Sequence, residues 1–188
     1  MTGMTSGIDI GPLSASAETI GALGDMLVAV VAAGGSVSFM HPLDPEAARA
    51  FWTAAMAAAA RDERVVLGAS IGGEIVGTVS VLLDFPPNQP HRAEIAKLMV
   101  RPDRRGKGAA RRLMEAAERV AAERNRTLLV LDTATEQGAG GLYDRLGFTL
   151  VGEIPDFALK PHGGLTGTLV YWKRIGAAAR GSDGAAQQ

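Results

Sequence analysis

The sequence contains no cysteine among its 188 residues. This absence excludes disulfides, thiolate metal sites and a cysteine nucleophile, and it fits a cytoplasmic protein. An excess of charge of either sign is also lacking, because 19 Lys and Arg residues stand against 20 Asp and Glu residues, for a net charge of -1. Nucleic-acid-binding proteins usually present a broad positive surface, so the charge balance argues against that class.

Long hydrophobic runs are missing as well. The most apolar helical stretch, residues 20–33, is too short to cross a bilayer and contains Asp25. The beginning of the sequence lacks the charged, then apolar, then small-residue order of a signal peptide. The three histidines, His41, His91 and His162, are far apart in the sequence and lack metal-ligand spacing. We therefore expect a soluble, cytoplasmic protein with no metal and no membrane partner.

The patterning of apolar residues predicts one domain over residues 1–176 and a disordered tail over 177–188. Within the domain it predicts a strand, two helices, three strands, a helix, a strand, a helix and two strands. Asp44 as N-cap and Pro45 at the first helical position give a strong helix start. This order indicates an α/β fold around a mixed, mostly antiparallel sheet flanked by helices, rather than a regularly alternating doubly wound sheet.

Residues 100–114, VRPDRRGKGAARRLM, join a predicted strand to a predicted helix. The first turn of a helix leaves backbone N–H groups unpaired and carries partial positive charge. Gly106 and Gly108 let the chain bend and let a ligand approach the backbone, and Ala109 and Ala110 keep that approach clear. Formal positive charge stands at the rim of this turn, on Arg104, Arg105 and Lys107. The stretch favours a phosphate or pyrophosphate, with a basic solvated turn as the alternative.

Two common phosphate-binding motifs do not explain this turn. The P-loop string G-x-x-x-x-G-K-[ST] does not occur in the sequence. The dinucleotide fingerprint G-x-G-x-x-G also fails, because Arg111 stands where its third glycine would follow Gly106 and Gly108. The turn is therefore neither a P-loop nor a dinucleotide-binding loop.

Arg105, Gly108 and Ala110 match R-x-x-G-x-A, which fits the Q/R-x-x-G-x-G/A signature of one enzyme superfamily, and GLYDRLGFTLVG further along resembles its L-Y-x-x-x-G-F segment. On these motifs the sequence resembles the GNAT superfamily of acetyl-CoA-dependent N-acetyltransferases over residues 45–175. The strings LVLDT, GLYDRLGF and IPDFAL make it similar, more narrowly, to the tabtoxin-resistance acetyltransferases. The resemblance implies the GNAT fold, with a sheet that splays at its central strands.

The resemblance also implies an acetyl-CoA site built largely from backbone groups. In the family, the strand before the loop binds the pantetheine arm through its free backbone, and this role falls here to Leu98, Met99 and Val100. The backbone amides after that strand would hold the pyrophosphate, at Arg105, Gly106, Lys107, Gly108, Ala109, Ala110 and Arg111. Many family members carry an Asn at the position of Glu136, and that Asn contacts the pantetheine. Because this chain has Glu136 instead, the resemblance does not imply the same contact here.

Three side chains are candidates for proton transfer when an amine attacks the thioester. The resemblance makes Tyr143 the acid that protonates the departing CoA thiolate, with packing beside Phe148 as the alternative. Glu94 and Asp132 stand out because strands rarely bury acids, and the tabtoxin-resistance group implies that they receive the proton of the amine. The alternative role for Glu94 is an ion pair with a nearby arginine, and the alternative role for Asp132 is to cap the following turn.

The acceptor contacts are the least determined part of the site. Trp52, at helical spacing with its apolar neighbours, and Phe85, in the proline-rich loop, are the candidate substrate-binding residues, with core packing as the alternative for Trp52. Without cysteine, direct transfer in a ternary complex is favoured over a thiol acyl-enzyme. The predicted function is transfer of acetyl from acetyl-CoA to a primary amine of a small molecule, with an amino-acid-like toxin or antibiotic as one option.

Two other classes of function stay open at this point. One is a non-catalytic acyl-CoA-binding sensor or regulatory module that uses the same phosphate-binding turn. The other is a nucleic-acid-binding protein that uses the arginine cluster, whose binding would fall steeply with salt and would not respond to CoA. Since family members often dimerise, the resemblance also allows a homodimer. An amine panel assayed for thiol release would separate the enzyme from the sensor.

Overall fold

The computed structural model describes residues 7–137 and 140–176. The strands and helices follow the predicted order, and two short 3-10 turns, η1 (Pro102–Arg104) and η2 (Thr135–Gln137), precede the last two helices. The tail predicted for residues 177–188 lies outside the described residues. The elements in chain order are β1 (Asp9–Pro12), α1 (Ala17–Ala32), α2 (Pro45–Ala60), β2 (Arg64–Ile71), β3 (Glu74–Leu82), β4 (Arg92–Val100), α3 (Ala109–Glu123), β5 (Leu128–Ala134), α4 (Gly140–Arg145), β6 (Thr149–Leu159) and β7 (Leu165–Arg174).

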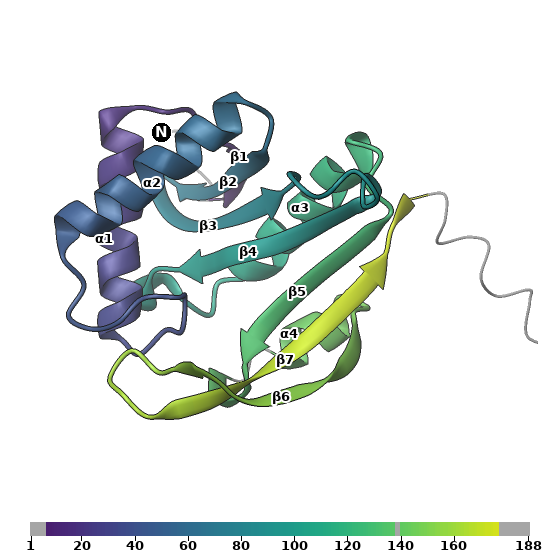
Figure 1. Cartoon of the computed structure of the whole chain (residues 1–188). Helices are drawn as coiled ribbons and strands as arrows, with labels where there is room; N and C mark the ends of the chain where they lie inside the picture. Colours follow the sequence, from purple (N-terminus) through teal and green to yellow (C-terminus); the bar gives the residue numbers. More distant parts are fainter. Residues whose placement is uncertain (1–6, 138–139, 177–188) are drawn as a thin grey trace, which may run out of the picture.

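A seven-stranded sheet forms the centre of the molecule, with the strand order β1-β2-β3-β4-β5-β7-β6. Every neighbouring pair is antiparallel except β4 and β5, which are parallel. Helices α1 and α2 lie over one face, and α3 and α4 lie over the other (Figure 1). The mixed, mostly antiparallel sheet that the sequence predicts is confirmed.

Local sequence signals explain where several of these elements begin. Ser16 caps α1 by accepting a hydrogen bond from the Thr19 backbone N–H at 3.0 Å. Asp44 caps α2 in the same way through the Glu46 N–H at 3.1 Å, which confirms the predicted helix start before Pro45. Between β2 and β3, Gly72 and Gly73 both have positive φ, as a two-residue hairpin turn of this kind requires.

The core consists of two buried clusters, one on each face of the sheet. Beneath α3, Leu113 and Met114 pack against side chains of the central strands, among them Leu129 of β5. Between the sheet and the α1–α2 pair, the largest buried side chain is Trp52, which shares its cluster with Met99 of β4. Strand β4 is thus packed from both sides, and this holds it in place beside the region where the sheet opens.

The sheet opens between β4 and β5. These strands pair only at residues 92–94 with 128–130. Beyond that point β4 stays with β3 up to the Val100–Gly77 pair, whereas β5 stays with β7 up to the Ala134–Thr168 pair. The predicted splay of the central strands is therefore confirmed, and the second half of β4 has no strand partner on its β5 side.

A bulge interrupts β4 inside this open part. Lys97 and Leu98 both lie between the Ala96–Ser80 and Met99–Thr78 pairs, where β3 supplies only Val79. Lys97 has a φ of 53°, in the left-handed region that residues with side chains rarely adopt. Bulges of this kind bend a strand and redirect its side chains, and they are common beside functional sites.

Candidate active site

A cleft of about 860 Å³ lies where β4 and β5 separate. Its walls come from the loop after α1, the open half of β4, the start of α3, the end of β5, α4, and the β6–β7 pair. Most of the predicted site residues line it, namely Leu98, Met99, Val100, Arg105, Gly106, Gly108, Ala109, Ala110, Arg111, Asp132 and Tyr143. Four others lie outside this lining: Lys107, Glu94, Trp52 and Phe85.

The start of α3 forms one end of the cleft. Gly108 is the N-cap residue, with φ of 83°, and no side chain caps the helix there. The N–H groups of the first turn therefore have no side-chain partner and carry the positive end of the helix dipole. Gly106 also has positive φ, and a Cβ at either glycine would meet no protein atom within 4 Å. This end of the cleft offers open space lined with amides, which suits a phosphate or pyrophosphate.

The basic side chains around this end are partly neutralised by acids. Arg101 and Arg104 both form ion pairs with Glu74 at the start of β3. Arg111 pairs with Glu115 one helical turn later, at 2.8 Å. These pairs tie the loop to the β2–β3 hairpin and reduce its net positive charge. The backbone amides at the start of α3 are therefore better placed to bind an anion than the side chains of these paired arginines.

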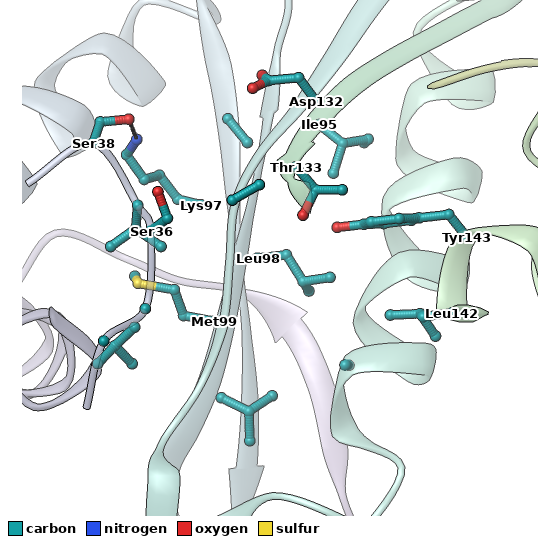
Figure 2. Close-up of a pocket in the computed structure, with 18 of the residues that line it drawn as sticks. Ser36, Ser38, Ile95, Lys97, Leu98, Met99, Asp132, Thr133, Leu142 and Tyr143 are labelled. Carbon is teal, nitrogen blue, oxygen red and sulfur yellow. Dashed lines mark hydrogen bonds between the residues drawn. The ribbon is translucent and has the colours of Figure 1, made fainter. Parts of the chain in front are cut away.

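Tyr143 stands on the α3 side of the β4–β5 gap. Its side chain is 5% exposed and packs against Phe148 and Tyr171, with ring centroids 6.0 and 5.5 Å away. In Figure 2 its hydroxyl points across the gap toward Thr133 at the end of β5. Burial raises the pKa of Tyr143 to about 12, and the nearby Asp132 carboxylate acts in the same direction. The phenol therefore stays protonated at neutral pH and can donate a proton into the cleft.

Asp132 lies at the end of β5, and its Oδ2 accepts a hydrogen bond from the Thr168 hydroxyl at 2.9 Å. Its neighbours Leu129 and Leu131 belong to the core beneath α3. Because side chains alternate along a strand, Asp132 faces the opposite side, toward α1 and α2. Among the described residues its hydrogen-bond partner is a hydroxyl, so the exposed carboxylate of Asp132 leaves room for a ligand amine in the cleft.

Glu94 lies where β4 and β5 are still paired, opposite Val130. Its carboxylate accepts a 2.7 Å hydrogen bond from Arg92, which is the arginine contact considered from the sequence. The Arg92 guanidinium also lies 4.3 Å from the centre of the Phe85 ring, so Phe85 belongs to this cluster beside the proline-rich loop. A role for Glu94 as a base, or for Phe85 in acceptor binding, stays a prediction.

Trp52 is fully buried between α2 and the sheet, within the cluster that includes Met99. Its indole N–H has no hydrogen-bond partner among the described residues. Phe51 beside it is half-buried, and the two rings meet edge to face with centroids 5.1 Å apart. The geometry favours core packing for Trp52, and an acceptor contact is left as a prediction.

Trp52→Phe separates these two roles. We expect the free energy of unfolding to fall by about 1–3 kcal/mol, because the smaller ring leaves a void in the core. The KM for the acceptor should not change, since the residue does not line the cleft. Urea unfolding and steady-state kinetics measure the two quantities. A raised acceptor KM with unaltered stability would instead make Trp52 a substrate contact.

Sequence reasoning missed several polar side chains of the cleft, among them Ser38, Lys97 and Thr168. A signal existed for Lys97, because IAKLMV (residues 95–100) places one charged residue within an otherwise apolar half-strand. The serine and threonine stand in ordinary loop and strand contexts and give no such signal. Their place in the site depends on how the loop after α1 and the β7 strand are brought to β4 and β5.

His41 and His162 are distant in the sequence but lie side by side in the fold. Their ring centroids are 4.5 Å apart, and the His41 backbone N–H donates to the Pro161 carbonyl at 2.9 Å. No group of three or more acidic or histidine side chains within residues 7–137 and 140–176 is arranged to hold a metal ion. In the same part of the chain, no helix has the length and apolarity needed to cross a bilayer.

Comparison with known proteins identifies the family. The chain is 37% identical to N-acetyltransferase 8 of Rattus norvegicus over 87 residues. This segment covers 45% of this chain and 39% of that protein, so the chain spans about two fifths of the length of this relative. In fold, the chain is similar to an N-acetyltransferase from Staphylococcus aureus Mu50, with a TM-score of 0.77 at 17% identity, covering 91% of this chain and all of the other.

A second solved structure of the same fold is that of the Salmonella typhimurium protein yncA with its cofactor acetyl-CoA. Its TM-score is 0.71 at 18% identity, and the match covers 90% of this chain and 95% of that one. Residues 36–148, more than half of the chain, match the acetyltransferase (GNAT) family. That segment contains the open half of β4, the start of α3 and Tyr143. The chain belongs to the acetyltransferase (GNAT) family.

Proposed function

We propose that the protein is an acetyl-CoA-dependent N-acetyltransferase that acetylates a primary amine of a small molecule by direct transfer. One observation carries this proposal. The amide-lined start of α3 lines the same cleft as two side chains that are candidates for proton transfer, Tyr143 and Asp132. A phosphate-binding end alone would fit any acyl-CoA-binding module. The buried, protonated phenol and the exposed carboxylate add the chemistry of an acyl transfer to an amine.

The cleft fits the shape and chemistry of acetyl-CoA. The amides at the start of α3 would hold its pyrophosphate, because Gly106 and Gly108 leave open space where side chains would otherwise stand. The open half of β4, at Leu98, Met99 and Val100, has no strand partner on its β5 side, and its backbone groups there would bind the pantetheine arm. When bound, acetyl-CoA supplies an acetyl thioester whose carbonyl carbon accepts the lone pair of the amine.

The side chains of the cleft would move the protons of this reaction. Asp132 would receive the proton that the acceptor ammonium must lose before its nitrogen can attack. Glu94, on the same face of the sheet but paired with Arg92, would assist from farther away or through water. Tyr143 would donate its proton to the departing CoA thiolate as the C–S bond breaks. The nitrogen would lose its second proton as the amide forms, and this proton would return to the Tyr143 phenolate, so each transfer releases one proton through Asp132.

The proposal is tested by a broad amine panel with acetyl-CoA, in which the release of free CoA thiol is followed. We expect thiol release that depends on both the protein and an amine. Tight acetyl-CoA binding with no thiol release for any amine would favour the sensor module instead. Binding of nucleic acid that weakens steeply with salt, together with no binding of CoA, would overturn both proposals.

Asp132→Asn tests the assignment of the base. We expect kcat/KM for the amine to fall by about tenfold to a hundredfold, because the amide cannot take up the proton. The acetyl-CoA dissociation constant should remain unchanged. Asp144→Asn is the matched control, since Asp144 is exposed and lies outside the cleft lining. Equal activities of the two variants would remove Asp132 from the mechanism, and Glu94→Gln would then be the next variant to assay.

Narrower features of the proposal rest on the sequence resemblance alone. The strings shared with the tabtoxin-resistance acetyltransferases support detoxification of an amino-acid-like toxin or antibiotic as the biological role. A homodimer and a cytoplasmic location likewise stay predictions. Acetylation of the toxin in vitro, with protection of cells that express the protein, would test the first of these.

A further inference from the structure

Lys97 is a charged side chain that the proposed acetyl transfer does not use. It stands at the bulge of β4, half-buried, and lines the cleft. Its φ of 53° is unfavourable for a residue with a side chain. Such backbone strain tends to be retained at functional sites.

Among the described residues, the direct contacts of the Lys97 ammonium are a hydroxyl and two aromatic rings. Its Nζ donates a hydrogen bond to the Ser38 hydroxyl at 3.0 Å. The ring centroids of Phe39 and Phe51 lie 6.0 and 5.7 Å from the same atom, so aromatic faces make up much of its environment. None of the ion pairs formed by the described residues involves Lys97. A partly desolvated ammonium without a carboxylate partner is unfavourable unless a ligand supplies one.

The electrostatic balance at Lys97 agrees with this. Burial lowers its pKa, and the positive charge of Arg64 on β2 acts in the same direction. The carboxylates of Asp132 and Glu94 oppose the shift from a distance, but they do not cancel it. An anion bound directly at Nζ would favour the charged form, so anion binding and protonation of Lys97 should reinforce each other.

The position of Lys97 relative to the reacting groups defines which ligand could supply the anion. Figure 2 shows Lys97 directed toward Ser38, on the side of β4 away from Tyr143. Asp132 also faces the α1–α2 side, as argued above from the alternation along β5. A ligand entering the cleft from this side meets a carboxylate at the end of β5 and an ammonium on β4. Two opposite charges in one cleft are complementary to a ligand that carries both an amine and an acid.

We propose that Lys97 binds the carboxylate of an amino acid acceptor, whose amine faces Asp132. Lys97 is then a specificity-determining residue that selects α-amino acids over simple amines. The Phe39–Phe51 pair, with ring centroids 5.3 Å apart, lies beside the Lys97 ammonium but outside the residues that line the cleft. This inference rests on the proposed function for its chemistry, but the binding of the carboxylate can be measured without any turnover.

The test is calorimetric titration of the CoA-saturated protein with each common α-amino acid and with its primary amide. The amide keeps the amine and the side chain and removes only the negative charge. For the amino acid that binds, we expect the amide to bind about tenfold to a hundredfold more weakly, the range for a charge-assisted hydrogen bond. Lys97→Met should abolish this difference, and Lys97→Arg should retain part of it.

The controls address folding and charge. Lys97→Met and Lys97→Arg both keep a side chain at the strained φ, and unchanged CoA affinity would show that the cleft is intact. Lys160→Met removes a lysine that is already paired with Glu136, at 3.2 Å, and that lies outside the cleft lining. This variant should keep the full preference for the acid. Its behaviour separates a local contact at Lys97 from a general loss of positive charge.

Several outcomes overturn the inference. Equal affinity of acid and amide for the wild-type protein, a preference that persists in Lys97→Met, or no binding of any common α-amino acid would each do so. Thiol-release assays on the same panel test acetyl transfer independently of carboxylate binding. Transfer to amines without any preference for acids would remove the role of Lys97 alone. A preference that depends on Lys97 but no transfer would remove the enzyme and keep the carboxylate site.

Discussion

Gly108→Val is expected to raise the dissociation constant of acetyl-CoA by about a hundredfold or more, because it removes at least two charge-assisted hydrogen bonds from backbone amides. Gly108 has φ of 83°, a conformation that a β-branched residue does not adopt without strain. The new side chain would also enter the open space at the start of α3, where no protein atom lies within 4 Å. Equilibrium titration with acetyl-CoA measures the effect.

Gly73→Val provides a matched control for Gly108→Val. Gly73 has φ of 86°, is exposed, and would likewise place its Cβ in open space, but it lies in the β2–β3 hairpin turn. Both variants should lose about 1–3 kcal/mol of unfolding free energy from backbone strain. Only Gly108→Val should lose acetyl-CoA binding. If the two variants bound acetyl-CoA equally well, the start of α3 would not be the pyrophosphate site.

Tyr143→Phe is expected to lower kcat by about 10²–10⁴-fold, the usual contribution of a positioned general acid, while the acetyl-CoA dissociation constant changes little. The hydroxyl points into the gap between β4 and β5, whereas the ring packs in the core and survives the substitution. Because the pKa of Tyr143 is raised to about 12, the wild-type phenol holds its proton at neutral and mildly alkaline pH. Loss of the proton donor is therefore the only large change.

Tyr171→Phe is the control for this substitution. The Tyr171 ring lies beside that of Tyr143 and is equally buried, but it does not line the cleft. Burial raises the pKa of Tyr171 as well, so a raised pKa alone does not distinguish the two residues. We expect Tyr171→Phe to keep nearly wild-type turnover. Undiminished turnover in Tyr143→Phe would leave packing beside Phe148 as the role of Tyr143.

Much of the architecture follows from local signals in the sequence. The Asp44-Pro45 pair and the glycine turn between β2 and β3 fix element boundaries through dihedral preference and capping, which act over a few residues. The start of α3 after Gly108, and its suitability for binding an anion, likewise follow from signals within a few residues. The splay between β4 and β5 required the family resemblance, since no local pattern shows which strands will separate.

The missing parts of the site depend on contacts between distant segments. The bulge at Lys97 exists only when β4 pairs with β3, and Ser38 reaches it across the space between the loop after α1 and the sheet. Whether Trp52 faces the core or the cleft depends on how α2 is rotated against the sheet. For Glu94, the sequence does show a possible ion-pair partner two residues away, Arg92. The two side chains meet because residues 92 and 94 lie on the same face of β4.

We have proposed that this cleft transfers an acetyl group from acetyl-CoA to an amine. The most direct test follows the acetyl group itself, by mass spectrometry of the amine after incubation with acetyl-CoA labelled in the acetyl group. We expect label on the amine in an amount equal to the thiol released, in the wild-type protein and not in Gly108→Val. Thiol release without labelled amine, or acetyl-CoA binding with neither product, would contradict it.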